Sequence, residues 1–364
     1  MSGARVFVVG PYPPPVHGAA MVTAAIADRL EAHVEVRRCD ISPGRLSRGP
    51  VYHLRRVWRV LAATAAIAEN VGRPGCVYIS AAGGSGLLYN LALAAVARLL
   101  RQRVFVHHHS FAYLDRDSAI MRLLTKVAGS AAVHVALCPR MAARLRERYP
   151  AVARHMVLSN AAFHPPAAGM EAAGTGALRL GHMGNLSDEK GLDLVLELFR
   201  EASSSGLAAR LVLAGPPADE TAARAIAAAR EVHGDGLDYR GPVYGEDKDR
   251  FFADIDLFLF PTRYVNEAEP IVLFEAMARG VPVIAYERGC IAEQLGEGAA
   301  AAGIVVPPQE PFVRRAAAGL RELAQTPDRL AAARRAASAR MARLHDEAAT
   351  QIEDVLRALA GQVT

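Results

Sequence analysis

The sequence predicts an α/β protein with two doubly wound domains, and three observations carry this prediction. Short apolar runs alternate with helical patterns, a Pro- and Gly-rich stretch divides the chain, and the two parts differ in charge. Continuous apolar strands between helices are typical of parallel sheets that are covered on both faces. A chain of 364 residues is also long enough for two such domains.

Four apolar runs in the first part are expected to be strands: ARVFVVG, GCVYIS, RVFVHHH and VHVALC. Helical patterns separate them, among them residues 19–32 and 87–101. The run 87–100 is too short and too polar to span a bilayer. The first strand begins without a basic segment and a long apolar core before it, so we expect a cytoplasmic protein.

Five further runs are expected to be strands in the second part: LRLGHMG, ARLVLAG, LDYRG, IDLFLFP and VPVIAY. Residues 193–203, 221–233 and 271–279 have helical patterns between them. Ligands of doubly wound folds bind beyond the carboxyl ends of the strands, so the cleft between the domains is the expected site. No G-x-G-x-x-G motif follows the first strand, which argues against a dehydrogenase.

The position of the domain boundary is predicted from the net charge of the two parts of the sequence. Residues 1–165 contain 21 basic and 8 acidic residues, a net charge of +13, whereas residues 166–364 contain 21 and 29, a net charge of −8. The sign changes at residues 164–177, HPPAAGMEAAGTGA, a stretch that is expected to be a linker. We therefore predict a first domain of residues 1–165 and a second of residues 175–339.

Metal and cofactor sites are not predicted. The four cysteines lack any paired spacing, which argues against a zinc site or a disulfide framework and favours buried or half-buried thiols. They are Cys39, Cys76, Cys138 and Cys290. Three histidines, residues 107–109, are consecutive on an expected strand, where neighbouring side chains alternate between faces and cannot all bind one metal ion.

The most informative segment is NEAEPIVLFEAMARGVP, which contains Glu267 and Glu275. Glu267 lies in a polar loop and is expected to face the cleft, whereas Glu275 lies in an apolar helix and is expected to line its wall. Pro270 fits the first turn of that helix, where the amides of Ile271 and Val272 form an anion site. Carboxylates beside an anion site indicate a nucleotide-sugar pocket. The alternative is that Glu267 is a solvated loop residue and that Glu275 is a charge favoured by the helix dipole.

The same segment resembles the signature of retaining glycosyltransferases of family 4, two glutamates separated by seven residues and followed by Ala-Met-Ala-x-Gly-x-Pro-Val. The matching residues are Glu267, Glu275, Ala276, Met277, Ala278, Gly280, Pro282 and Val283. The resemblance implies the GT-B fold of two facing Rossmann-like domains. It also implies a last helix, residues 340–364, that crosses back to the first domain, and metal-independent transfer with retention at the anomeric carbon.

Residues 180–194, LGHMGNLSDEKGLDL, predict a strand, a loop and a helix capped by Ser187 or Asp188. Lys190 near the helix start opposes the helix dipole unless an anion lies between them. The family pattern here is Gly-Arg-x-x-x-x-Lys-Gly, in which Arg and Lys hold the donor diphosphate. Lys190 and Gly191 match, but Asn185 stands at the Arg position. A solvated surface lysine is the alternative.

The first loop, GPYPPPVHGAAMVT, resembles the family's N-terminal glycine loop and is expected to bring His17 and Gly18 to the acceptor or a phosphate. A structural loop with a chance histidine is the alternative. His109 is the last histidine of VFVHHHS, at a place where the family often has a histidine that contacts the donor sugar. His107 lies on the same face of the strand and is the second candidate.

The resemblance implies roles for these residues in sugar transfer from a nucleoside-diphosphate donor. Glu267 would bond the sugar hydroxyls, Glu275 the ribose, and Lys190 the diphosphate, while the backbone near Gly215 and Val243 would surround the nucleotide. We expect UDP-GlcNAc or UDP-glucose before GDP-mannose, and a hydroxyl acceptor on a sugar, a small molecule or a lipid-linked intermediate. A nucleotide-sugar epimerase and a non-catalytic binding subunit remain alternatives.

A basic patch is predicted in the first domain from its arginines and aromatic residues: Arg45, Tyr52, Arg48, Arg55, Arg56, Trp58 and Arg59. Two interpretations fit it equally. It could contact anionic lipid at the inner face of the membrane, or it could be a solvated arginine-rich helix. No nucleic-acid-binding module accompanies the charge, so nucleic acid is not an expected partner.

Overall fold

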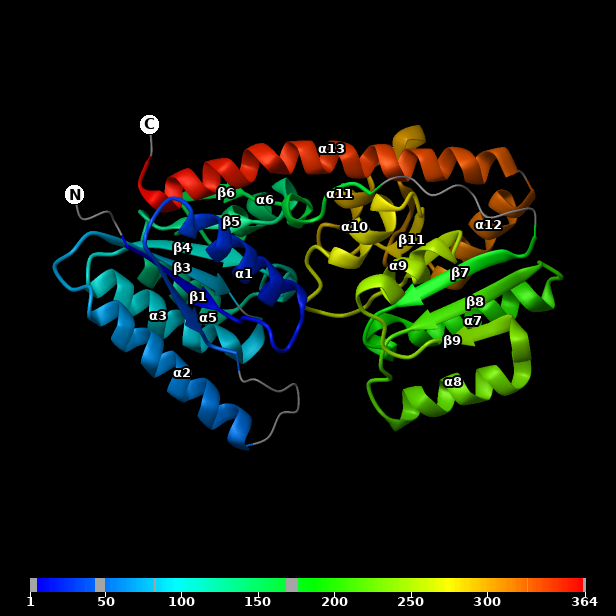
Figure 1. Cartoon of the computed structure of the whole chain (residues 1–364), viewed down its shortest axis with the longest axis horizontal. Helices are drawn as coiled ribbons and strands as arrows, with labels where there is room; N and C mark the ends of the chain where they lie inside the picture. The colour runs from blue at the N-terminus through cyan, green and yellow to red at the C-terminus, as the bar shows by residue number, and fades with distance from the viewer. Residues whose placement is uncertain (1–4, 43–49, 82, 168–175, 326, 363–364) are drawn as a thin grey trace. The chain divides into compact units, whose positions relative to one another are not determined.

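The computed structural model describes residues 5–42, 50–81, 83–167, 176–325 and 327–362, and the chain divides into two compact units (Figure 1). Unit 1 comprises residues 1–163 and 347–364, and unit 2 comprises residues 164–346. Each unit contains a six-stranded sheet in which all strand pairs are parallel. The predicted fold class of two doubly wound α/β domains is confirmed.

The sheet of unit 1 has the strand order β2-β1-β3-β4-β5-β6. Its strands are β1 (Arg5–Gly10), β2 (Val36–Asp40), β3 (Gly75–Ala81), β4 (Arg103–His108), β5 (Val133–Ala136) and β6 (Arg154–Val157). The chain moves from β1 to one side, then crosses back to β3 and continues to the other side. The carboxyl ends of β1 and β3 therefore flank the point at which the strand order reverses.

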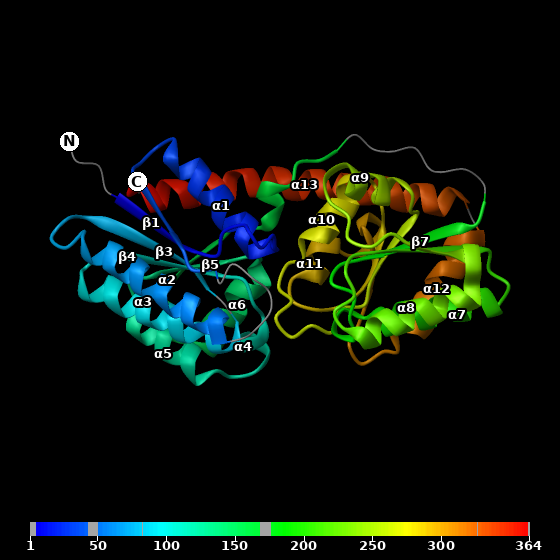
Figure 2. The same cartoon turned by 60° about the horizontal axis from the view of Figure 1, so that its bottom comes forward.

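Helices cover both faces of this sheet because right-handed crossovers in opposite directions lie on opposite faces. The helices are α1 (Gly18–Glu31), α2 (Pro50–Ala68), α3 (Leu87–Leu99), α4 (Ala112–Asp115), α5 (Ala119–Ala128) and α6 (Pro139–Arg148). Figures 1 and 2 show α2, α3 and α5 on one face and α1 on the other. The end of α13 (Pro327–Ala360) also belongs to unit 1, where Arg103 donates to the carbonyl oxygens of Ala358 and Leu359, each at 2.6 Å.

The sheet of unit 2 has the strand order β12-β11-β10-β7-β8-β9. Its strands are β7 (Leu178–Met183), β8 (Ala209–Ala214), β9 (Leu237–Tyr239), β10 (Leu257–Phe260), β11 (Val283–Tyr286) and β12 (Gly303–Val306). The order reverses between β7 and β10, which are hydrogen-bonded neighbours in the middle of the sheet. In doubly wound folds, ligands bind beyond the carboxyl ends of the strands at such a reversal point.

The helices of unit 2 are α7 (Leu192–Ser204), α8 (Glu220–His233), α9 (Gly245–Ala253), α10 (Ile271–Ala278), α11 (Ile291–Leu295), α12 (Phe312–Gln325) and the part of α13 up to Asp346. Figure 1 shows α7 and α8 on one face of the sheet and α9 and α10 on the other. The core on the α7 face is a continuous apolar cluster that includes Leu180, Leu198, Phe199 and Phe312. This cluster fixes the strands whose loops carry the candidate site.

Other sequence predictions can be placed on this structure. Cys39 and Cys76 are free buried thiols, and burial raises their pKa values to about 11 and about 12, so neither is a reactive thiolate. Arg45 and Arg48 lie outside the described residues. Among the described helices, none is long and apolar enough to cross a membrane.

Candidate active site

The candidate site lies where the strand order of unit 2 reverses. Lys190 follows β7 and Glu267 follows β10, and the Nζ atom of Lys190 lies 2.6 Å from the Oε2 atom of Glu267. The two residues are far apart in the sequence, and it is the pairing of β7 with β10 that brings their loops together. An ion pair therefore occupies the edge of the sheet at which doubly wound folds bind their ligands.

The loop after β7 fixes the backbone of Lys190. Ser187 accepts a hydrogen bond from the amide of Lys190 at 3.2 Å and caps the short 3-10 turn Asp188–Lys190. The predicted cap of the following helix is wrong, because the N-cap residue of α7 is Gly191, which has no side chain to accept a bond. Gly191 follows with a φ of 87°, and a Cβ atom there would lie 2.4 Å from the carbonyl oxygen of Pro261. This close approach requires glycine and locks the loop after β7 against the loop after β10.

Glu267 is a buried acid rather than a solvated loop residue. Only 8% of it is exposed, and its Oε2 atom accepts a hydrogen bond from Thr262 at 3.0 Å as well as the contact with Lys190. The Nζ atom of Lys190 also lies 4.6 Å from the ring centre of Tyr264. Because its side chain is 24% exposed, Lys190 keeps one side open to a ligand and is not a freely solvated lysine.

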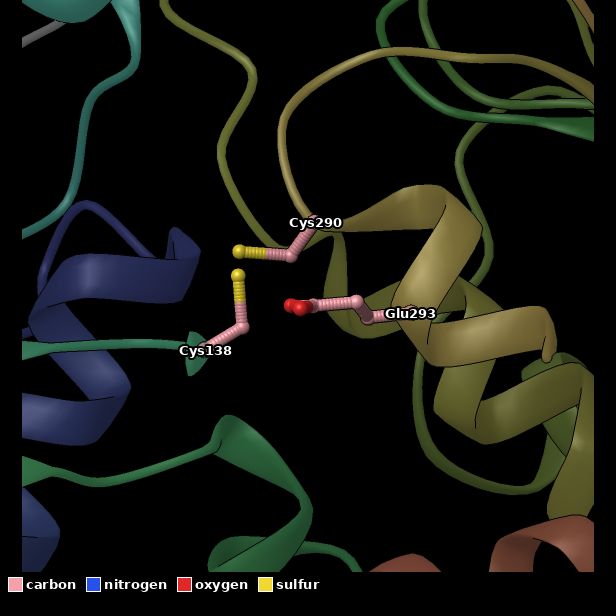
Figure 3. Close-up of side chains that lie close together, drawn as sticks. All are labelled: Cys138, Cys290 and Glu293. Atoms are coloured by element: carbon pink, nitrogen blue, oxygen red, sulfur yellow. The ribbon is translucent and has the colours of Figure 1, made fainter. Parts of the chain in front are cut away.

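The loop that carries Glu267 is held from behind by the start of α11. The amide of Cys290 donates to the carbonyl oxygen of Ala268 at 2.7 Å, and Gln294 donates to the carbonyl oxygen of Pro270 at 3.2 Å. Figure 3 shows Cys290 and Glu293 at this end of α11. These bonds hold the acid in place without using its carboxylate.

Glu275 lies on α10, and Lys248 of α9 reaches it. The Nζ atom of Lys248 lies 2.5 Å from the Oε1 atom of Glu275, whereas the Oε2 atom is buried and has no hydrogen-bond partner among the described residues. A buried carboxylate oxygen without a donor is costly and is suited to accept a bond from a ligand hydroxyl. Sequence reasoning missed Lys248, which the charged pattern of α9 does not distinguish from a surface lysine.

The start of α10 differs slightly from the prediction. Pro270, expected in the first turn, is instead the N-cap residue, with φ and ψ of −67° and 122°, and the helix begins at Ile271. The residue before the helix has extended backbone, which is normal for an N-cap position. Ile271 and Val272 are therefore the first two residues of the helix. Amide groups at these positions have no hydrogen-bond acceptor within the helix.

The loops after β7, β8 and β9 pack together at the same edge. Gly215 follows β8 with a φ of 121°, and a Cβ atom there would lie only 1.8 Å from the carbonyl oxygen of Gly184. Its amide donates to the carbonyl oxygen of Gly241 at 2.7 Å. Asn185 is exposed in the first of these loops, and Val243 is half-buried beyond the third. The structure thus gathers the predicted donor-binding residues of unit 2 at one edge.

The predicted residues of unit 1 lie at the carboxyl edge of its own sheet. His17 is the N-cap residue of α1, where its Nδ1 atom accepts a hydrogen bond from the amide of Ala20 at 3.4 Å, and Gly18 is the first residue of the helix. His109 directly follows β4. Burial, and to a smaller extent the nearby His17, lowers the pKa of His109 to about 3, so its imidazole is neutral at physiological pH.

His107 and His109 share one face of β4, with ring centres 4.2 Å apart. His107 is fully buried, and its Nδ1 atom lies 2.6 Å from the hydroxyl oxygen of Tyr78. His108 points to the other face, where its Nε2 atom lies 2.9 Å from the Nδ1 atom of His134. His109 is partly exposed. Of the two candidates, His109 therefore offers a surface to a ligand, whereas His107 supports it from beneath.

Residues 172–340 match the family model described as "Glycosyl transferases group 1". The chain has no significant match among curated protein sequences. It resembles the solved structure of HepE from Anabaena in complex with UDP, with 16% identity over 98% of this chain and 100% of that chain and a TM-score of 0.71. Unit 2 is thus similar in sequence to group 1 glycosyltransferases.

Two other solved structures share the fold of the whole chain. One is sucrose-phosphate synthase from Thermosynechococcus elongatus, with 16% identity, coverage of 99% and 100% and a TM-score of 0.72. The other is WaaG, a glycosyltransferase involved in lipopolysaccharide biosynthesis, with 15% identity, coverage of 98% and 100% and a TM-score of 0.62. The fold is therefore that of GT-B glycosyltransferases.

Proposed function

We propose that this chain is a cytoplasmic glycosyltransferase that transfers a sugar from a nucleoside-diphosphate donor to a hydroxyl acceptor. The observation that carries the proposal is the pairing of Lys190 with Glu267 at the point where the strand order of unit 2 reverses. This pair lies inside the region that matches the group 1 family model. A cation and an acid held side by side suit a ligand that carries both a diphosphate and hydroxyl groups.

Donor binding would replace the ion pair with two new sets of contacts. The Lys190 ammonium would contact the diphosphate, and the Glu267 carboxylate would accept hydrogen bonds from hydroxyls of the sugar. As the bond to the anomeric carbon breaks, negative charge grows on the diphosphate, and a fixed cation stabilises that charge more than it stabilises the bound donor. Lys190 would in this way perform the electrostatic task without a metal ion.

The nucleoside would lie against the other residues of the same edge. The orphaned Oε2 atom of Glu275 would accept a hydrogen bond from a ribose hydroxyl while Lys248 holds the opposite oxygen. Gly215 and Val243 would offer backbone to the base and phosphates, and the first amides of α10 would face the phosphates. Each contact uses a group whose position in unit 2 is already fixed by the fold.

We further propose UDP as the nucleotide, because the structure of HepE, which has the same fold, contains UDP. The resemblance to family 4 supports retention at the anomeric carbon, with the leaving diphosphate taking the acceptor proton. His17, Gly18 and His109 are assigned to the acceptor and the sugar. A neutral His109 would bond a hydroxyl rather than pair with a charge. The acceptor would be a sugar, a small molecule or a lipid-linked polysaccharide intermediate.

One observation favours a second candidate function. Asn185 stands where the family pattern has an arginine that holds the diphosphate, and it is exposed. A chain with a weaker diphosphate clamp could serve as a non-catalytic subunit that binds the nucleotide sugar for a partner enzyme. Such a subunit would bind UDP with the same residues and would release no nucleotide from any donor.

A panel of nucleotide sugars tests these alternatives. We expect titration calorimetry to detect UDP binding and slow hydrolysis of one UDP-sugar to release UDP in the absence of acceptor. Introducing an arginine with N185R should tighten UDP binding, because it adds a charged hydrogen-bond donor to the site. Binding of UDP without release from any donor would support the second candidate, and failure to bind any nucleotide would contradict both.

A further inference from the structure

The outer face of α2 exposes a continuous apolar surface. Its large apolar side chains are 42–72% exposed, and Leu54 and Trp58 are the most exposed of them. We call these residues the outer stripe: Val51, Leu54, Val57, Trp58 and Leu61. Positions 51, 54, 58 and 61 follow the three- and four-residue spacing of one helix face. Five large apolar side chains on one exposed helix face indicate an interaction surface.

The outer stripe is not a misplaced core face, because the opposite side of α2 already packs against unit 1. Val60, Ala63 and Ile67 are buried there. Arg56 also turns toward this side, with its guanidinium carbon 4.9 Å from the ring centre of Tyr89 on α3. The helix is therefore anchored to the unit by one face and presents a second apolar face outward.

Charge indicates which partner fits the outer stripe. The sequence of α2 contains three arginines and no acidic residue. Arg59 forms an ion pair with Asp40 inside unit 1, whereas Arg55 is exposed beside Trp58. The first 165 residues carry a net charge of +13. Apolar side chains with a basic rim on a positive domain match an anionic lipid surface, which supplies both an acyl boundary and negative charge.

We propose that α2 binds the interface of an anionic lipid bilayer, with the outer stripe inserted at the level of the headgroups. This goes beyond the proposed function, because it depends on neither the donor nor the reaction. The alternative occupant is a second copy of this chain. A two-fold contact through the stripe would place the Arg55 side chains and two positive units near each other, which disfavours it.

The position of α2 connects this surface with the chemistry of unit 1. Because α2 follows β2, its first turns lie at the carboxyl edge of the sheet, the edge that carries His17 and His109. A bilayer bound to the outer stripe would therefore lie near the edge assigned to the acceptor. An acceptor carried on a lipid could then reach that edge without leaving the membrane surface.

Trp58 provides a direct test, because it is the only tryptophan in the chain and lies in the centre of the stripe. The full-length protein would be mixed at low salt with vesicles of phosphatidylcholine or of an equimolar mixture with phosphatidylglycerol. We expect a blue shift of Trp58 emission and co-sedimentation with the anionic vesicles, both reversed by high salt. An unchanged spectrum with both vesicle types would overturn the proposal.

Two variants separate the apolar and charged contributions, and both change exposed residues, so the fold should be retained. L54S/L61S keeps the tryptophan and should weaken vesicle partitioning by about 100-fold, because two apolar side chains no longer leave water. R55E should weaken it by about fivefold or more. The control V232S removes a side chain that is 76% exposed on α8 and should bind like the unchanged protein.

Two results would overturn the proposal even if emission shifts. If L54S/L61S partitions like the unchanged protein, the outer stripe is not the contact. If the shift depends on protein concentration without vesicles, and sedimentation gives the mass of a dimer, the stripe binds a second copy. Neither result depends on whether the chain transfers sugar, so the proposed function is tested separately.

Discussion

The carboxyl edges of the two sheets carry different chemistry on similar architecture. In unit 2, two lysine–glutamate pairs lie at this edge, Lys190 with Glu267 and Lys248 with Glu275. In unit 1, the same edge carries histidines whose pKa values are lowered, chiefly by burial, so that they are neutral. The candidate site residues are charged and paired at one edge, whereas at the other edge they are neutral histidines.

This difference matches what each edge would have to bind under the proposed function. A donor diphosphate carries charge that a lysine can offset, and the paired acids keep the lysines fixed until the donor arrives. A hydroxyl acceptor carries no charge, and a neutral imidazole can bond it without the cost of burying an ion. Under the proposed function, two doubly wound sheets would have separate tasks through the residues on their loops, because the fold itself does not determine function.

Acid should have the largest effect on the two units, because it should lower the stability of unit 1 before that of unit 2. Burial lowers the pKa of His134 to about 4 and that of His109 to about 3, below the ordinary value of 6.5. Between these lowered pKa values and pH 6.5, the unfolded chain therefore binds more protons than the folded chain. Stability is fully present above about pH 6.5 and falls by about 1.4 kcal/mol per pH unit for each such histidine as acid is added.

Hydrogen exchange at about pH 7 and about pH 5 would measure this loss, with rates corrected for the intrinsic pH dependence of exchange. We expect peptides from β4 and β5 to lose more protection than peptides from β7 and β10, because the described residues of unit 2 include one comparable histidine, His182, with a pKa of about 4. Equal loss in both units, or earlier opening of unit 2, would contradict the assignment of neutral buried histidines to unit 1.

Replacing Lys190 should have the largest effect on activity. K190M removes the cation at the reversal point of unit 2 and leaves the Glu267 carboxylate buried without its partner. We expect turnover of the donor to fall about 100- to 1,000-fold, the usual effect of removing one preorganised group that stabilises transition-state charge. K126M is the matched control, since Lys126 is exposed on α5. Similar turnover in both variants would refute the role of Lys190.

The fold could be predicted from the sequence because the central strands of both sheets are continuous apolar runs. The strands that the apolar runs did not predict, β2, β6 and β12, all lie at sheet edges. An edge strand is half exposed and needs no apolar run; β2, for example, exposes Arg37 and Arg38. Periodicity therefore identifies the buried middle of a sheet better than its margins.

The site was predicted less completely, and for a different reason. The signature identified Glu267 and Glu275, and the loop pattern identified Lys190. The sequence could not show that Lys190 bonds Glu267, because this contact joins residues 77 positions apart through the pairing of β7 with β10. Lys248 was missed because its role depends on α9 lying beside α10. Short motifs name candidate groups, whereas partners that are distant in sequence require the fold.

The two glutamates should differ in what they affect. E267Q should lower turnover by about 10- to 100-fold, because a charged acceptor beside the reacting sugar is replaced by a neutral amide. E275Q should mainly raise the KM for the donor, because its free oxygen is assigned to the ribose. Steady-state kinetics would separate the two effects.

E231Q serves as the control for both glutamate variants, since Glu231 is exposed on α8. It should leave turnover and KM unchanged. If E267Q and E275Q change turnover and KM to the same extent, the division of roles between sugar and ribose is wrong, although both acids could still contact the donor.

Replacing Gly215 should have the smallest effect, a loss of stability in unit 2. G215A places a Cβ atom 1.8 Å from the carbonyl oxygen of Gly184 at a φ of 121°, so the loops after β7 and β8 must separate. We expect the free energy of unfolding to fall by about 2 kcal/mol more than in G206A. Gly206 has a φ of 77° and no neighbour within 4 Å of the added atom, so it isolates the backbone cost.

Chemical denaturation of both variants gives this difference directly, and UDP titration shows whether the separated loops also weaken donor binding. Because Gly215 makes its contact within unit 2, the acid sensitivity of β4 and β5 in unit 1 should stay as it is in the unchanged protein. A G215A variant as stable as G206A would mean that the loops yield easily, and the packed edge of unit 2 would then owe its shape to the bound nucleotide rather than to the fold.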